Sequence, residues 1–285
     1  MTSIPENAVV VGIDGSDRSQ IALQWAAGLA RRRGLPLAAI SAWNYPAALM
    51  MPMVGAPALP ADDFRDAAEQ RLATTLEATP TDPAVGERHV VMGSPRSVLT
   101  EAAEQANTLV LGRTGTTRIT RTWLGSTAAY CVRHADCPVV ITHDATEPEH
   151  RIVVAVDGSP SSIDALVWAL NLGDDHAVTA VFSHDEWELD ELSLDDELRA
   201  SLDRRATEIL NDAVLDACAR AGRDESTVLR EVRSGDPRST IVENGDPDAL
   251  LVLGAHGHSG LARWILGSLA DFAVNHSPGT VVIVR

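Results

Sequence analysis

Three glycines and a serine follow a hydrophobic run at two places in the chain. They are Gly112, Gly115, Gly125 and Ser126 in the first copy and Gly254, Gly257, Gly267 and Ser268 in the second. Glycine allows a backbone to approach a ligand closely, and a Gly-Ser pair opening a helix offers free amides and the positive end of the helix dipole to phosphate oxygens. The spacing therefore predicts two phosphate-binding loops. An ordinary strand-to-helix turn, with Ser126 as the N-cap, is the alternative.

The loops belong to an internal repeat that spans almost the whole chain. VVVGIDGSDRSQIALQWA, from Val9, aligns with IVVAVDGSPSSIDALVWA, from Ile152, and the alignment pairs Asp14 with Asp157. Self-similarity of this kind identifies the structural unit before any other feature is considered.

The period of the repeat is that of a domain. GSPRS at Gly93 pairs with GDPRS at Gly235, an offset of about 142 residues, which is too long for a solenoid repeat and typical of a compact domain. The polar stretch 143–150 resembles a linker. We predict two domains, 1–145 and 146–285.

Within each domain, short apolar runs alternate with longer segments of helical periodicity. The predicted strands are 8–13, 36–43, 87–92, 108–112 and 138–142, then 151–156, 177–182, 226–232, 249–254 and 280–285. The predicted helices of the first domain are 17–33, 62–79, 95–106 and 125–134. Continuously apolar strands are typical of parallel sheets covered on both faces, so we predict two tandem, doubly wound α/β domains. Asp14 and Gly112 would then meet at the crevice where the strand order reverses.

The composition bounds the class of protein. Hydrophobic residues make up 45% of the 285, enough for two cores, and no signal-peptide pattern or apolar run of membrane-spanning length occurs. We expect a cytoplasmic protein. The three cysteines form no CxxC pair, so we expect small buried hydrophobic residues rather than redox groups or metal ligands.

Charge excludes several functions. All 23 basic residues are arginines, so a P-loop lysine and a Schiff base are impossible. The net charge is −17, and residues 146–285 carry most of it, with 11 arginines against 26 acidic residues. Such a surface disfavours nucleic acid and anionic membranes as partners.

With GIDGS, AVDGS and both glycine loops in place, the sequence resembles the universal stress protein family in its tandem two-domain form. The resemblance implies ATP as the ligand, with or without Mg²⁺, and five parallel strands in the order 3-2-1-4-5 in each domain. Asp14 and Asp157 would contact the nucleoside, while Ala42 and Ser183 would offer backbone groups to adenine. The residues implied around the ribose and phosphates are Gly112, Gly115, Gly125, Ser126 and Thr127, with Gly254, Gly257, Gly267 and Ser268.

The sequence departs from the family pattern in two ways, and the second of these departures favours the first site. Its loop often continues with valine and a second hydroxyl residue, whereas Thr127-Ala128 and Leu269-Ala270 follow here, so each site lacks one donor. The second domain also replaces a neutral segment after its second strand with an acidic one. For Asp14, the alternative to contact with the nucleoside is a turn-forming role before the first helix.

Other clusters leave alternatives open. The acidic run 184–198 is either a metal site or, in better agreement with its spacing, a solvated segment. The pair His256 and His258 lacks a third metal ligand and would otherwise face nucleotide or solvent. Arginines in the first loop either neutralise a triphosphate or lie on the surface; they are Arg113, Arg118 and Arg121. The methionine-rich segment 49–60 closes over a base, contacts another chain or is a packed loop.

These features favour a binding protein over an enzyme. No residue is singled out as catalytic, because the loops share no general base beyond Asp14 and Asp157, and at most slow ATP hydrolysis is expected. A dehydrogenase is disfavoured because G-x-G-x-x-G is missing after the first strand. A protein that binds partners without nucleotide is the third hypothesis. The family resemblance further implies pairing through the fifth strands, within the chain as a pseudo-dimer or between chains as a homodimer; a regulatory partner is unidentified.

Overall fold

The computed structural model describes residues 5–45, 60–113, 124–144, 150–173, 176–184, 196–257 and 265–285. Alternating strands and helices make up both halves. The first half contains β1 (Val9–Gly12), α1 (Asp17–Arg33), β2 (Leu37–Trp43), α2 (Ala61–Ala78), β3 (Glu87–Met92), α3 (Pro95–Ala103), β4 (Thr108–Gly112), α4 (Ser126–His134) and β5 (Val139–Thr142). The second contains β6 (Arg151–Ala155), α5 (Pro160–Leu170), β7 (Ala177–His184), α7 (Asp196–Ala221), η2 (Glu225–Thr227), β8 (Val228–Ser234), η3 (Arg238–Glu243), β9 (Ala249–Gly254), α8 (Ser268–His276) and β10 (Val281–Val284). Every predicted strand is present, with ends within two residues of those expected.

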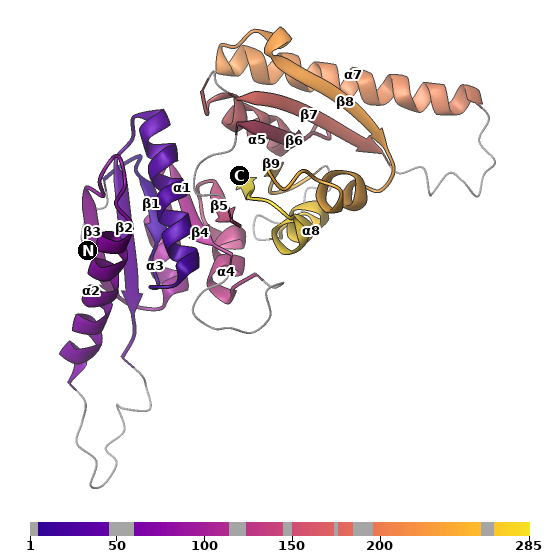
Figure 1. The fold of residues 1–285 in the computed structure, drawn as a ribbon. Coiled ribbons are helices and arrows are strands. Elements are labelled where there is room, and N and C mark those ends of the chain that lie inside the picture. The colour runs from indigo at the N-terminus through magenta and orange to yellow at the C-terminus, as the bar shows by residue number, and fades with distance from the viewer. Residues whose placement is uncertain are drawn as a thin grey trace, which may run out of the picture.

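The strands form one ten-stranded sheet in the order β3-β2-β1-β4-β5-β10-β9-β6-β7-β8. Each half is parallel and has the order 3-2-1-4-5, which confirms the predicted doubly wound fold. The halves join where β5 pairs antiparallel with β10, with Val140 opposite Val282 (Figure 1). This is the expected internal pairing of the fifth strands, and it leaves neither of these edges open for a second chain.

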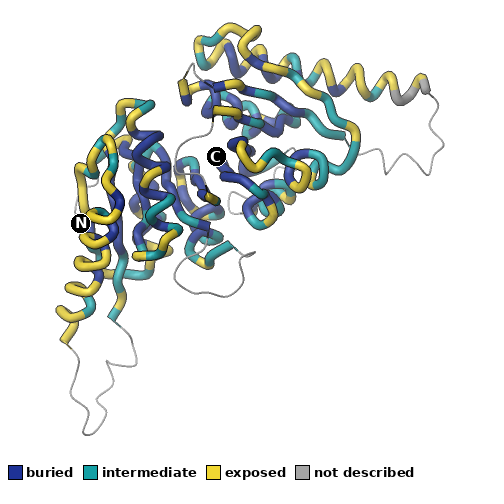
Figure 2. Tube along the Cα trace, viewed as in Figure 1, coloured by how far each residue is buried: buried dark blue, intermediate teal, exposed yellow. Residues whose placement is uncertain are grey.

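Helices cover both faces of the sheet, because alternate strand residues point to opposite sides. Val9 and Val11 pack in a core under α1, α2, α5 and α7, whereas Val10 packs in a second core with residues of α3, α4, η3 and α8. Both cores run across the junction between the halves. The central strands are accordingly the most buried part of the molecule, whereas the edge strands β3 and β8 are largely exposed or half-buried (Figure 2).

The halves differ after their third strands. GSPRS begins a nine-residue α-helix, α3, whereas GDPRS leads into the six-residue π-helical segment η3. Asn244 and Gly245 stand where the first half has Ala102 and Ala103. Asparagine and glycine are poor helix formers and alanine is the best, so the second segment ends early.

Three arginines cross the junction between the halves. Arg33 of α1 donates to the carbonyl oxygen of Trp168 at 3.1 Å and stacks 4.7 Å above that residue's ring. Arg113, just after β4, donates to carbonyl oxygens at the end of α8, including that of Ser277 at 2.8 Å. Arg285, just after β10, donates to the carbonyl oxygen of Val132 at the end of α4, at 3.1 Å. Each guanidinium group lies at the C-terminal end of a helix of the other half, where carbonyl groups lack partners within the helix and the helix dipole is negative. These contacts stabilise the junction.

All three cysteines are buried, as expected. Burial raises the pKa of Cys131 and of Cys137 to about 12, so their thiols stay protonated at neutral pH. No helix in the described part of the chain is long and apolar enough to cross a bilayer.

Replacing Arg33 with alanine should destabilise the whole chain. The substitution leaves the carbonyl oxygen of Trp168 and the side-chain oxygen of Asn107, which Arg33 reaches at 2.9 Å, without this donor. We expect a loss of about 2 kcal/mol in the free energy of unfolding in urea, since each unsatisfied buried partner costs about 1–3 kcal/mol. Arg31→Ala, an exposed change on the same helix, is the control; equal losses for both variants would contradict a special role for Arg33.

Thiol titration should distinguish the folded from the unfolded chain. We expect Ellman's reagent at pH 8 to label none of the three cysteines in the native protein and all three in guanidinium chloride, because their thiols are buried and protonated. Rapid labelling of the native chain would contradict the burial of the two cores.

Candidate functional site

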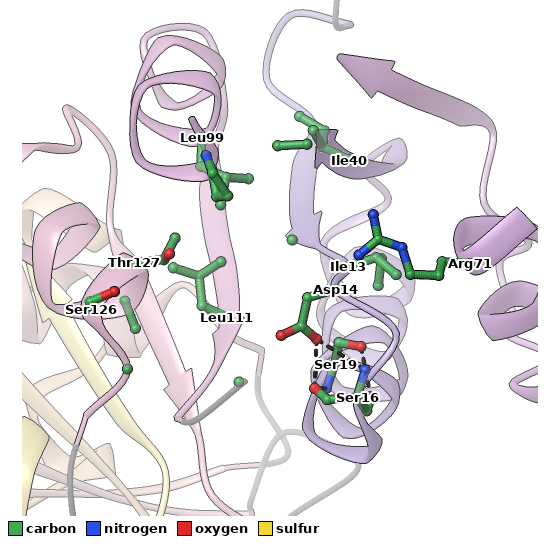
Figure 3. Close-up of a pocket in the computed structure, with 16 residues that line it drawn as sticks. Ile13, Asp14, Ser16, Ser19, Ile40, Arg71, Leu99, Leu111, Ser126 and Thr127 are labelled. Carbon is green, nitrogen blue, oxygen red and sulfur yellow. Dashed lines mark hydrogen bonds between the residues drawn. The ribbon is translucent and has the colours of Figure 1, made fainter. Parts of the chain in front are cut away.

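A cavity of about 330 Å³ lies beyond the carboxyl ends of β1 and β4, where the strand order reverses. This is the expected ligand position in a doubly wound sheet. Figure 3 shows its wall, built from β1, β2 and β4 with the first turns of α1, α3 and α4. The lining residues are Gly12, Ile13, Asp14, Ser16, Ser19, Ile40, Ala42, Arg71, Pro95, Leu99, Leu111, Gly112, Gly125, Ser126, Thr127 and Ala128.

Asp14 has the turn-forming role that the sequence offered as one alternative. Its Oδ1 accepts hydrogen bonds from the hydroxyl and the backbone N–H of Ser16, at 2.6 and 3.0 Å, and this turn starts α1. Ser16 in turn caps the helix by accepting from the N–H of Ser19 at 3.2 Å. The same carboxylate lines the cavity, and in Figure 3 it lies between β1 and the start of α4.

Gly112 and Gly254 are required by packing within the protein. A Cβ on Gly112 would lie 2.8 Å from the carbonyl oxygen of Arg18, in the first turn of α1. A Cβ on Gly254 would lie 2.7 Å from that of Ser161, in the first turn of α5. The sequence predicted close approach of a ligand at these glycines. The structure shows close approach of a helix, which brings the start of α1 or α5 up to the cavity.

The first turn of α4 has no side-chain cap. Gly125 is the N-cap residue and Ser126 the first helical residue, so the alternative of Ser126 as an ordinary N-cap is wrong. By contrast, serine side chains cap α1, α3 and α5. The N–H groups of Ser126, Thr127 and Ala128 therefore lie at the cavity wall, and within the described residues no side chain accepts their hydrogen bonds. α8 repeats the arrangement, with Gly267 as its N-cap.

The other end of the cavity is formed by β2 and α2. The carbonyl oxygen of Ile40 accepts from the N–H of Ile13 at 2.8 Å, so the peptide groups of Ala42 point the same way, past the end of β1. Arg71 of α2 lies here too, with its side chain over the turn at Gly15 (Figure 3). Sequence reasoning missed Arg71, because nothing in the repeat or in the helical pattern marks it.

The second half has an equivalent cavity of about 260 Å³. Its lining includes all six predicted residues, which are Asp157, Ser183, Gly254, Gly257, Gly267 and Ser268. The described lining contains no arginine and has His256 in its loop. The hydroxyl of Ser183 is already bonded to the carbonyl oxygen of Gly235 at 2.8 Å. A Cβ on Gly257 would lie 2.8 Å from Asp157 Oδ2, so the loop packs directly on that carboxylate.

The structure brings together the predicted residues of the first site that it describes. Asp14, Ala42, Gly112, Gly125, Ser126 and Thr127 all line one cavity. Gly115, Arg118, Arg121, His258, the segment 49–59 and residues 185–195 of the acidic run lie outside the described residues.

Arg113 has neither of the roles considered for it. Its side chain is 8% exposed and bonded to the end of α8, so it is not a loop cation that is available to phosphates. Burial lowers its pKa, and the nearby Arg18 lowers it further. The sequence could not reveal this role, because the acceptors are backbone carbonyls more than 160 residues away.

The comparisons with known proteins agree with this architecture. The profile of the universal stress protein family matches residues 7–143 and 149–285. Universal stress protein Rv2005c of Mycobacterium tuberculosis is 30% identical over 293 residues, covering 98% of this chain and 97% of that protein. Universal stress protein Rv2623 of the same organism is 27% identical, covering 97% and 96%.

A solved structure shares the fold over its full length. The crystal structure of a universal stress protein from Archaeoglobus fulgidus matches 99% of both chains with a TM-score of 0.66 and 18% identity. Two family matches that together span nearly the whole sequence place this chain in the universal stress protein family, in its tandem two-domain form.

Proposed function

We propose that the first cavity binds ATP and that its occupancy changes the conformation or association of the chain in a stress or growth-regulation response in the cytoplasm. The observation that carries the proposal is the convergence of Asp14 and the uncapped start of α4 on one cavity at the switch point of the sheet. Backbone amides at a helix start bind phosphate without lysine, which this chain lacks.

The two ends of the cavity differ in the way that a nucleotide requires. Ala42, Arg71 and the apolar side chain of Ile40 form one end, suited to a base that needs backbone hydrogen bonds and a flat contact. Ser126 and Thr127 form the other end, suited to phosphates (Figure 3). Mg²⁺ would enter with the phosphates, and Asp14 is the carboxylate among the described lining residues that could approach it.

The chemistry of the lining favours binding over turnover. The described lining of the first cavity includes no histidine and no carboxylate besides Asp14, whose Oδ1 already holds the turn to Ser16. A dedicated general base for activating water would need such a group within hydrogen-bond reach. Occupancy itself is then the signal, and it acts only through unequal affinity for two states of the chain.

The direct experiment is to denature the freshly purified protein and identify released nucleotide by chromatography, in moles per chain. ATP near one mole per chain supports the first cavity as the site, and near two supports both cavities. If no nucleotide is released and added ATP with Mg²⁺ gives no calorimetric signal, the proposal fails, and a protein that binds partners without nucleotide is the better account.

Ser126→Glu should weaken ATP binding in the first cavity strongly without harming the fold. A carboxylate at the start of α4 interacts favourably with the positive end of the helix dipole, but it repels phosphate groups. We expect at least about tenfold weaker ATP binding by calorimetry, because opposed like charges cost several kcal/mol. Ser126→Gln has a similar size without the charge and is the control; Ser268→Glu and Ser268→Gln test the second cavity in the same way. Unchanged affinity in both Glu variants would place the phosphates elsewhere.

Arg71→Ala should weaken the binding of adenosine and of ATP by the same factor, since Arg71 lies at the nucleoside end. A loss of about two- to fivefold is expected from the guanidinium's contact with a ring. A loss confined to ATP would instead assign Arg71 to the phosphates.

A further inference from the structure

The repeated motif GSPRS/GDPRS puts an arginine beside each cavity. Pro95 and Pro237 line the first and second cavities, and the next residues are Arg96 and Arg238. Both arginines are exposed. The motif therefore places an exposed cation at the rim of each site.

Each arginine rests on an aromatic ring of the helix that begins at the phosphate end. The Cζ atom of Arg96 lies 5.8 Å from the ring centroid of Tyr130 in α4, and that of Arg238 lies 5.6 Å from Phe272 in α8. These distances are within the range of a cation–π contact. The change from tyrosine to phenylalanine shows that the shared feature is the ring face and not the hydroxyl group.

The stacks are one helical turn from the serines of the glycine loops. Tyr130 is four residues after Ser126, and Phe272 is four residues after Ser268, so ring and serine share one side of their helix. A histidine stacks on each ring, His134 at 4.0 Å in the first half. His276 repeats this contact at 4.0 Å in the second. Arginine, ring and histidine recur at the same offset of 142 residues although the two halves differ in most other positions.

A nucleoside triphosphate carries more negative charge than helix amides alone offset, and this chain has no lysine to meet it. The other described arginines near the first cavity are committed elsewhere. Arg113 is bonded to α8, Arg18 pairs with Asp144, and Arg71 lies at the opposite end of the cavity.

We propose that Arg96 and Arg238 bind the outer phosphates of nucleotides held in the first and second cavities, each guanidinium being positioned by its aromatic ring beside the start of α4 or α8. This inference rests on the proposed nucleotide-binding function and adds to it the cation and the ligand class, a nucleoside di- or triphosphate rather than a nucleoside. With these arginines, both cavities would select ligands by the number of phosphates they carry. This includes the second cavity, whose described lining has no arginine.

The test compares ATP with adenosine in arginine variants. Arg96→Ala is made in the Ser268→Glu background, so that the measured binding is that of the first cavity. Arg238→Ala is made in the Ser126→Glu background, so that the measured binding is that of the second cavity. We expect each to weaken ATP binding by about tenfold, the loss for a hydrogen bond to a charged group, and to leave adenosine binding within about twofold. The difference should shrink between about 0.05 and about 0.5 M salt, because salt screens the exposed charge.

Arg88→Ala is the matched control, since it removes the same charge from an exposed position on β3, away from both cavities. We expect it to change neither affinity. Thermal unfolding of each variant checks the fold.

Three results would overturn the inference. ATP binding that Arg96→Ala and Arg238→Ala leave unchanged overturns it while the nucleotide site stands. Equal losses for ATP and adenosine would move the arginines to the nucleoside end. Failure of the unsubstituted protein to bind either ligand would overturn the proposed function together with this inference.

Discussion

The antiparallel pairing of β5 with β10 is the contact on which the rest of the molecule depends. It joins two five-stranded sheets into one and makes both hydrophobic cores continuous across the junction. The strands of the two halves run in opposite directions. The carboxyl ends of the strands in one half therefore lie on the opposite side of the sheet from those in the other half, and so do the two cavities. The pairing also covers two edges that would otherwise expose unpaired backbone groups to another chain.

The same junction links the helices that begin at the two cavities. Arg113 binds the end of α8 and Arg285 the end of α4, so each of these helices has its first turn at a cavity and its last turn held by the other half. An ion pair between Arg133 and Asp271 adds a direct contact between the two helices. A displacement of either helix start on ligand binding would therefore act on contacts with the opposite half. Under the proposed function, these contacts would give nucleotide occupancy a physical route to the conformation of the whole chain.

Much of the candidate site could be predicted because it is built from local chemistry that the repeat displays twice. The turn at Asp14, the glycine that ends β4 and the Gly-Ser helix start are each short segments whose residue types limit the backbone. The reason given for Gly112 was incomplete, because this glycine is also needed for the approach of α1. The Gly-Ser pair opens α4 as predicted, and only the alternative that made Ser126 the N-cap was wrong.

The sequence by itself determined the strands, the doubly wound class of fold and the loop residues expected at a switch point, because hydrophobic periodicity and loop chemistry depend on neighbours along the chain. The strand order came only from the family resemblance. The tertiary structure alone decided what the long side chains do. Arg33 and Arg113 act at the junction and Arg71 at the first cavity, while Arg96 and Arg238 lie on rings of the neighbouring helix. An arginine side chain reaches partners that are distant in the sequence. Its acceptors are often backbone carbonyls, which every residue carries, so the sequence does not reveal which arginine binds which acceptor.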